Sequence, residues 1–281
     1  MDLVVLGYLL HDVLDVDGQI KHCLGGVSAY ASLAALKLGL SVGIVSKVGG
    51  DFKYFNELKG IDLSGVSKQE LTTVFFNTYR KGIRTQKVAN IGESICPKGI
   101  PADYLKAKAI HLGPVFNEIS PETMRFLREN TNAFITLDPQ GFLRSSQNGL
   151  VLSKKLDFSL LGFVDLVKVS EKDCSREEIE AMKQKCPLVV VTRGKNGSTV
   201  FSKGKAFSIP FFRAKRLVDE TGAGDVFMAG FIKEWLSSQD AEKAALFGSA
   251  AASFAVEDFG VNGIGSLEEI NGRIMSCLTG F

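Results

Sequence analysis

Short runs rich in β-branched residues alternate with helical patterns along most of this 281-residue chain. A strand that is followed by a helix and then by another strand favours a parallel sheet with helices packed on its faces. The runs that have the length and composition of buried strands lie at residues 3–7, 42–46, 109–112, 133–138, 164–169 and 188–192. Their order predicts an α/β protein with a mostly parallel central sheet flanked by helices.

Capping residues mark where several helices begin. Ser120 precedes Pro121, whose missing N–H costs nothing in the first turn of a helix. The segments 175–178 and 266–269 read Ser-Arg-Glu-Glu and Ser-Leu-Glu-Glu, and both match the capping box. We therefore expect helices from residues 121, 176 and 267. The apolar stretch 244–256 is shorter than the ~20 residues that span a bilayer, so we expect a buried helix there.

One region interrupts this alternation. Residues 72–89 alternate with a period of two on either side of Arg80-Lys81-Gly82, which predicts an antiparallel hairpin. Such a hairpin is a candidate lid over a binding site, although hairpins without a functional role also decorate α/β proteins. The chain has no internal repeat and no low-complexity linker, so we expect a single domain over residues 1–281.

The charge balance excludes some classes of function. Basic residues number 33 and acidic residues 31, a formal net charge of +2, whereas nucleic-acid and lipid-surface binding need a concentrated basic surface. The five cysteines form no Cys-x-x-Cys pair, so neither a disulfide framework nor a zinc knuckle is indicated. The first residues lack the basic segment of a secretion signal. We expect a cytoplasmic protein that binds neither nucleic acid nor membrane.

The most informative stretch is residues 219–231, where small residues stand at the start of an apolar helix. Gly222, Ala223 and Gly224 leave backbone N–H groups open at the amino end of that helix, where the helix dipole favours an anion. Asp225 follows at once and is placed to accept a proton from a hydroxyl beside that anion. This combination suits phosphoryl transfer, in which amides hold the transferred group and a carboxylate activates the attacking oxygen.

Residues 219–231 also have other interpretations, one of which stays open and two of which fit the sequence less well. A helix that merely carries an acidic residue in its first turn is the simplest alternative. The sequence has no Walker-type Gly-x₄-Gly-Lys-Ser/Thr motif. A dinucleotide fingerprint fails because Phe227 stands where its third glycine is required.

These segments resemble the ribokinase-like, or PfkB, family of carbohydrate kinases. Residues 221–225 and 228–231 look like the family's carboxy-terminal signature, and Gly25-Gly26 with residues 48–51 looks like its amino-terminal one. The resemblance covers essentially the whole chain, and the wording of residues 138–144 looks closest to small archaeal members related to inositol kinases. It implies a ribokinase-like fold with a small β lid around residues 8–22 and 72–90, and ATP bound near the carboxy-terminal signature.

The resemblance also assigns roles to individual residues. Asp225 would be the catalytic base, with Gly222, Ala223 and Gly224 forming the anion hole. The acceptor would meet Asp12 and the backbone at Gly25 and Gly26, and Asp138, Gln140 and Arg144 lie in a segment like the family's Asp-Pro-Asn-x-Arg. The nucleotide would meet Thr192, Gly194, Gly197, Thr221 and Asn262, although Asn196-Gly197 is also a good tight turn.

The magnesium segment departs from the family pattern. Many members carry Asn-x-x-Glu, whereas this chain offers Ser170-x-x-Asp173, with Glu171 as a substitute. Oxygen ligands remain, which suits Mg²⁺, a hard cation that keeps much of its water shell.

The sequence therefore predicts an ATP- and Mg²⁺-dependent kinase that acts on a hydroxyl of a small polyol or sugar. The alternatives are a nucleoside kinase of the same family and a non-catalytic sugar or nucleotide sensor on the same fold. A nicotinamide-dependent oxidoreductase is disfavoured because the dinucleotide fingerprint is missing. An exposed lid edge would allow a homodimer.

Overall fold

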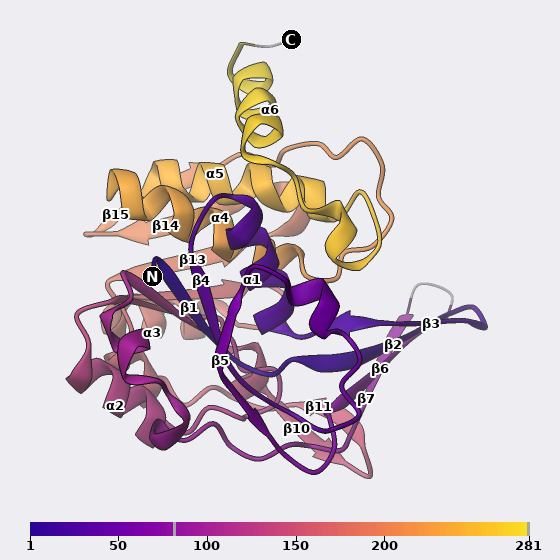
Figure 1. Ribbon diagram of the computed structural model, residues 1–281. Helices are drawn as coiled ribbons and strands as arrows, with labels where there is room; N and C mark the ends of the chain where they lie inside the picture. Colours follow the sequence, from indigo (N-terminus) through magenta and orange to yellow (C-terminus); the bar gives the residue numbers. More distant parts are fainter. Residues whose placement is uncertain (81–82, 280–281) are drawn as a thin grey trace.

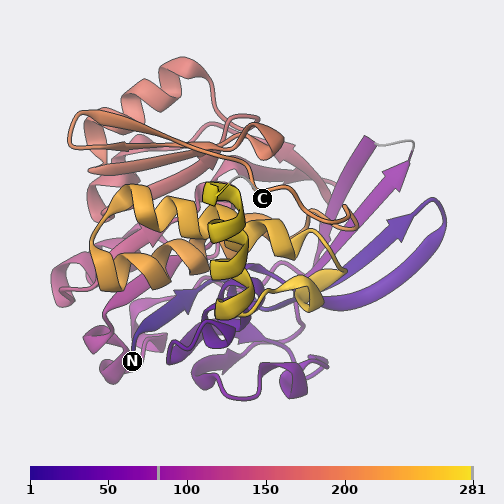
Figure 2. The same ribbon diagram turned by 90° about the horizontal axis from the view of Figure 1, so that it is seen from above.

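The computed structural model describes residues 1–80 and 83–279, and its strands form two sheets (Figures 1 and 2). The nine-stranded central sheet has the order β15-β14-β13-β12-β9-β8-β1-β4-β5. Its strands are β1 (Leu3–Leu6), β4 (Val42–Val48), β5 (Asp62–Lys68), β8 (Ala109–Leu112), β9 (Phe134–Leu137), β12 (Leu166–Ser170), β13 (Leu188–Thr192), β14 (Ser198–Ser202) and β15 (Lys205–Ile209).

Strands β12, β9, β8, β1, β4 and β5 pair in parallel with their neighbours, and only β14 and β15 add antiparallel pairs at one edge. β12 also pairs in parallel with β13. The six strands predicted from the sequence all lie in this sheet, with ends that differ by up to two residues. The expected mostly parallel α/β architecture is confirmed.

Helices cover both faces of the central sheet. They are α1 (Val27–Lys37), α2 (Pro121–Asn130), α3 (Arg176–Lys185), α4 (Ala223–Ser238), α5 (Ala241–Ala255) and α6 (Leu267–Thr279). Because successive side chains of a strand point to opposite faces, Leu3 and Val5 of β1 belong to the core under α1, α4 and α5. Val4 and Leu6 belong to a second core under α2 and α3. The sheet is therefore buried on both sides.

The helix starts follow the capping chemistry. The Ser120 side chain accepts the amide of Thr123 at 3.1 Å, and α3 carries a full capping box between Ser175 and Glu178. Ser266 and Glu269 make the same reciprocal pair before α6. The predicted helices from 121, 176 and 267 are confirmed, and the buried stretch 244–256 forms most of α5.

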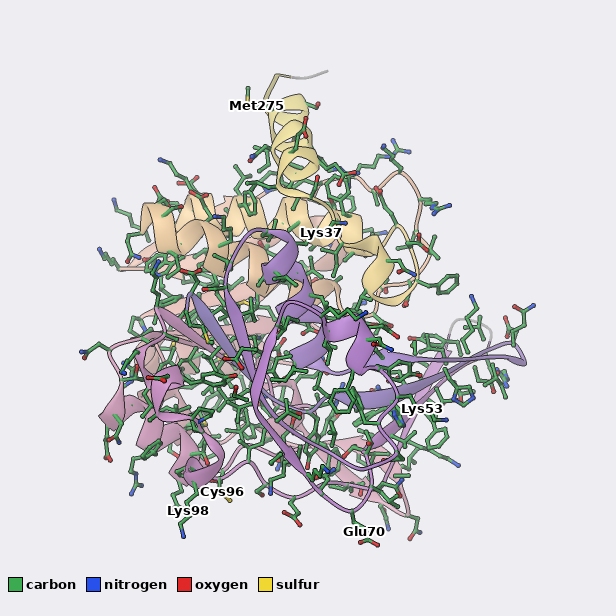
Figure 3. All side chains as sticks on the ribbon, in the orientation of Figure 1. Lys37, Lys53, Glu70, Cys96, Lys98 and Met275 are labelled. Carbon is green, nitrogen blue, oxygen red and sulfur yellow. The ribbon has the colours of Figure 1, made fainter. Side chains whose placement is uncertain are left out.

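The carboxy-terminal helix α6 stands at the top of the view in Figure 1, beyond α5. Lys37, at the end of α1, donates to the carbonyl of Ile264 just before α6. Figure 3 shows Lys37 at this junction and Met275 further along α6. The connection ties the last helix to the helix that packs beside the amino-terminal strand.

The second sheet, which we call the lid sheet, has the order β10-β11-β7-β6-β2-β3. Its strands are β2 (Leu10–Val16), β3 (Gln19–Gly25), β6 (Val74–Arg80), β7 (Ile83–Ala89), β10 (Arg144–Gln147) and β11 (Leu150–Ser153). The predicted hairpin is confirmed by the antiparallel pairing of β6 and β7, and Lys81 and Gly82 of its turn lie outside the described residues. Strands β10 and β11, which the sequence did not predict, also join this sheet.

In the part of the chain that the structure describes, no helix is both long and apolar enough to cross a membrane. All five cysteines are free thiols.

Candidate active site

A cavity of about 160 Å³ lies where the lid sheet, the ends of central strands and the amino end of α4 converge. Ligands bind at this edge in open α/β sheets, outside the carboxyl ends of the strands. Among the residues predicted from the sequence, those that line the cavity are Asp12, Gly26, Asp138, Gln140, Arg144, Thr221, Gly222, Gly224 and Asp225. Segments that are more than 200 residues apart in the chain thus meet in one place.

The amino end of α4 forms the floor for an anion. Gly222 is the N-cap, with φ of 76°, a left-handed conformation that favours glycine. A Cβ on Gly222 would lie 2.1 Å from the Tyr30 ring, so a side chain does not fit there. Gly222 and Gly224 line the cavity at the positive end of the helix dipole. Ala223 does not line it, and its amide donates to the Glu220 carbonyl at 3.4 Å.

Asp225 lies in the first turn of α4 and is 9% exposed. Burial raises the pKa of Asp225 to about 7, against the attraction of Lys168, and the charge of Asp138 adds to the rise. A carboxyl group with a pKa near neutrality is well matched to accepting a proton under physiological conditions. The predicted role of Asp225 as a general base stays a prediction, and the buried position of its carboxyl group in the cavity is compatible with it.

Asp12 faces Asp225 from strand β2 of the lid sheet. It is buried, and its Oδ1 accepts a hydrogen bond from the Asn77 side chain at 3.0 Å. Burial raises the pKa of Asp12 to about 7, although Arg84 acts in the opposite direction. A Cβ on Gly25 would lie 2.2 Å from Asp12 Oδ2. Gly25 therefore makes room for the Asp12 carboxylate, and only Gly26 of the pair lines the cavity.

The lid sheet adds a cluster of polar side chains that surrounds Asp12. Asn77 Oδ1 accepts hydrogen bonds from Arg84 Nη2 at 2.7 Å and from Gln86 Nε2 at 2.8 Å. All three side chains line the cavity. Since the Asn77 carbonyl takes both donors, its amide is fixed in the orientation that donates to Asp12. This network offers both donors and acceptors to a ligand rich in hydroxyl groups.

Arg144 approaches from the start of β10. Its Nη1 donates to the Val115 carbonyl at 3.0 Å, and its guanidinium lies 5.5 Å from the centre of the Phe75 ring. Burial lowers the pKa of Arg144 to about 10, and the neighbouring Arg84 adds to the shift. The guanidinium groups of Arg84 and Arg144 and the Gln140 side chain thus line the same cavity.

Lys168 and Asp138 form a buried ion pair in the same cavity. Lys168 lies on β12, directly before the Ser170–Asp173 segment, and Asp138 follows β9. Burial alone would lower the pKa of Lys168, but the attraction of Asp138 and Asp225 outweighs it, so the pKa is raised. The sequence prediction did not single out Lys168. The sequence feature that could have identified Lys168 is a lysine within the apolar run 164–169, which is predicted to be a buried strand.

The residues predicted to meet a nucleotide are dispersed. Thr192 ends β13, where its hydroxyl donates to the Val169 carbonyl at 3.3 Å. Gly194 and Gly197 have positive φ, and a Cβ on Gly197 would lie 2.1 Å from the Ile209 carbonyl oxygen. These contacts support the tight-turn interpretation of the segment. Thr221 lines the cavity, whereas Thr192, Gly194 and Gly197 do not.

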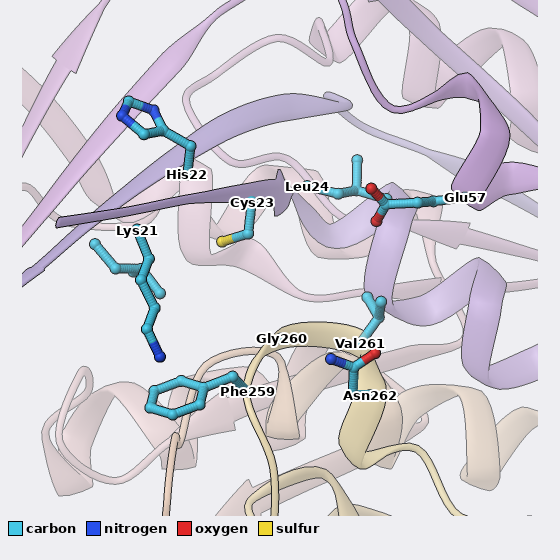
Figure 4. Close-up of a pocket in the computed structure, with 10 residues that line it drawn as sticks. Lys21, His22, Cys23, Leu24, Glu57, Phe259, Gly260, Val261 and Asn262 are labelled. Atoms are coloured by element: carbon cyan, nitrogen blue, oxygen red, sulfur yellow. The ribbon is translucent and has the colours of Figure 1, made fainter.

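Asn262 lines a second cavity, of about 310 Å³, between β3 and residues 259–262 (Figure 4). Lys21 Nζ lies 3.5 Å from the centre of the Phe259 ring at one side of it. In the described chain, no residue lines both cavities. The predicted contact of Asn262 with a nucleotide stays a prediction.

The two residues predicted for magnesium differ in their surroundings. Glu171 pairs with Arg193 at 3.4 Å, and neither Glu171 nor Asp173 lines the cavity. Burial and the negative charge of Asp138 raise the pKa of Asp173, while Lys168 opposes the rise. In the described part of the chain no three His, Cys, Asp or Glu side chains are grouped to hold a metal by themselves. A Mg²⁺ ion held by one carboxylate together with nucleotide phosphates and water fits Asp173.

Comparison with known proteins gives consistent results. The profile of the pfkB family carbohydrate kinases matches residues 1–268. The inositol 3-kinase of Arabidopsis thaliana is 31% identical over 275 residues, which cover 92% of this chain and 74% of that protein. The nucleoside kinase of Methanothermobacter thermautotrophicus is 32% identical over 273 residues, which cover 86% of this chain and 81% of that protein.

A solved structure of a pyrophosphate-dependent kinase in the ribokinase family is similar over 96% of this chain and 99% of that chain. The TM-score is 0.83 at 22% sequence identity. This likeness confirms the fold that the sequence predicted.

Proposed function

The chain belongs to the PfkB family of carbohydrate kinases, and we propose that it transfers the γ-phosphoryl group of ATP to a hydroxyl of a small polyol or sugar, such as an inositol. One observation carries this proposal: the buried Asp225 carboxylate stands in the first turn of α4, in the same cavity as Asp12 and the Gly222–Gly224 backbone. An alcohol held by Asp12 and a phosphoryl group held by the helix amides would meet beside Asp225.

In the proposed reaction, the acceptor hydroxyl loses its proton to the Asp225 carboxylate as its oxygen attacks the γ-phosphorus. A new oxygen–phosphorus bond forms, and the bond from the γ-phosphorus to the bridging oxygen breaks and leaves ADP. The amides at Gly222, Ala223 and Gly224 stabilise the charge on the group in transfer. When bound, Mg²⁺ would neutralise part of the negative charge of the nucleotide phosphates. Asp173 is the residue that would hold it.

The acceptor side favours a compound with several adjacent hydroxyl groups. Asp12 accepts hydrogen bonds from hydroxyls, and Arg84 and Gln86 carry further donors on the lid sheet. Inositols and sugars have this chemistry. A nucleoside also presents ribose hydroxyls, and the similarity to an archaeal nucleoside kinase supports that second candidate.

The test is an assay of the purified protein with ATP, Mg²⁺ and a panel of inositols, hexoses, ribose and nucleosides, with ADP as the readout. A parallel assay with pyrophosphate in place of ATP tests which phosphoryl donor the protein uses. We expect ADP release with at least one inositol or sugar, and a loss of about 10²–10⁴-fold in kcat for Asp225→Asn, the range for removing a general base. Phe76→Ala, on the outer face of the lid sheet, is the control.

Binding of ATP without turnover of any acceptor would instead identify the protein as a sensor of sugar or nucleotide. Near-native turnover by Asp225→Asn with a verified acceptor would show that Asp225 is not the base.

We also propose that two copies of the chain associate through the exposed edge of the lid sheet at β3. We further propose that the enzyme works in the cytoplasm, where its free cysteines stay reduced.

A further inference from the structure

Lys168 places a buried ammonium group beside the amino end of α4. Its side chain is 8% exposed, and it comes from β12, an interior strand of the nine-stranded sheet. A Cβ built on Gly224 would lie 2.6 Å from Lys168 Nζ. The ammonium therefore occupies the space that the absence of a side chain at Gly224 leaves open.

The Asp138 carboxylate uses only part of the hydrogen-bonding capacity of the Lys168 ammonium group. A lysine has three N–H donors and no acceptor, and Asp138 is the only carboxylate within 4.0 Å of Nζ among the described residues. Lys168 lines the same cavity as Gly222, Gly224 and Asp225. Burying a charge is costly unless its donors are used. The remaining donors thus lie where an anion at the α4 amino end would receive them.

We propose that Lys168 is a further catalytic residue, whose ammonium group binds the phosphoryl oxygens while the phosphoryl group passes from donor to acceptor. This inference rests on the proposed kinase function. The step follows the bond changes given above: the acceptor proton goes to Asp225, the bridging oxygen leaves with ADP, and Lys168 keeps all its protons. Asp138 positions Lys168 through the buried ion pair between them.

The same geometry explains why residue 224 is a glycine. The helix itself does not need glycine at this position, because residue 224 lies inside α4, where alanine has the higher helix propensity. A methyl group there would displace the Lys168 ammonium from the anion site. Two features of one surface, the bare backbone and the ammonium, are therefore parts of a single phosphoryl-binding site.

The first experiment replaces Lys168 by methionine, which keeps much of the side-chain length and removes the charge. We expect kcat to fall about 10²–10³-fold, the cost of removing one preorganised donor to a transition state, with a much smaller change in KM for the acceptor. Lys47→Met is the matched control, since Lys47 also lies on a central strand and pairs with a carboxylate, Glu93, outside the cavity. Its kcat should equal that of the unmodified enzyme.

A second comparison separates catalysis from structure, because Lys168→Met leaves Asp138 buried without a partner. Lys168→Met is therefore also made in an Asp138→Asn background, where no such charge remains. We expect the double variant to turn over at least tenfold more slowly than Asp138→Asn alone, at equal thermal stability. Equal kcat values for these two proteins would show that Lys168 only neutralises Asp138, and the proposal would be wrong.

A third measurement does not depend on finding an acceptor. Inorganic phosphate, compared with chloride at the same ionic strength, should raise the melting temperature of the unmodified protein and of Lys47→Met, and should raise that of Lys168→Met far less. If all three proteins respond equally to phosphate, Lys168 does not bind the anion. If the unmodified protein binds phosphate through Lys168 but phosphorylates no acceptor, the proposed function fails while the anion site stands.

Discussion

At the scale of single residues, the cavity holds two carboxylates that are more costly to ionise than surface carboxylates. Burial raises the pKa of Asp12 and of Asp225 to about 7 in each case. Their positions differ, because Asp12 is held by the Asn77 amide, whereas Asp225 lies among the helix amides beside Lys168. In the proposed reaction the first would orient the acceptor, and the second would take its proton.

This pKa leads to a pH dependence of turnover. Asp225 can accept a proton only when it is ionised, so kcat at saturating acceptor should fall about tenfold per pH unit below pH 7 and level off above it. The measurement is kcat from pH 5 to pH 9 at constant ionic strength. The residual activity of Asp225→Asn should lack this acidic limb. An identical limb in that variant would assign the titration to another group.

At the scale of elements, the sequence was most informative where the determinants are local. The caps at Ser120, Ser175 and Ser266 act within four residues, so the helix starts could be predicted from short segments. The lid sheet was underestimated because β11 contacts β7 through a pairing between Leu150 and Lys87, far apart in sequence. The short strands β10 and β11 carry no strong alternation of their own.

The orientation of β6 gives a prediction about acceptor binding. Asn77 faces the cavity, while the adjacent Phe76 is 39% exposed and points the other way. Asn77→Ala removes the donor to Asp12 and the acceptor for Arg84 and Gln86, so we expect KM for the acceptor to rise about 10–100-fold, equivalent to about 1.4–2.7 kcal/mol. The change in kcat should be smaller. Phe76→Ala, measured in parallel, should leave KM unchanged, and an equal rise in both variants would indicate general damage to the lid.

At the scale of the whole molecule, the site exists only because distant segments converge. The glycine-rich helix start and Asp225 could be predicted from one continuous stretch, and Asp12 from the family resemblance. Lys168 could not, because its role depends on β12 lying beside the start of α4, a contact that no local pattern encodes. The signature segments thus predict part of the site, and the order of the strands in the central sheet adds Lys168 to it.

The lid sheet also has an edge that the rest of the described chain does not pair. β3 ends the strand order, and Ile20 on it is 62% exposed. An unpaired strand edge with an exposed apolar residue favours pairing with another copy, so we expect a particle of about twice 30.4 kDa by light scattering. Ile20→Lys should shift the particle to the monomer mass, because it places charge at the interface. Leu152→Lys on β11, away from this edge, should leave the dimer intact. A monomer for the unmodified chain at micromolar concentration would show that the β3 edge stays unpaired in solution.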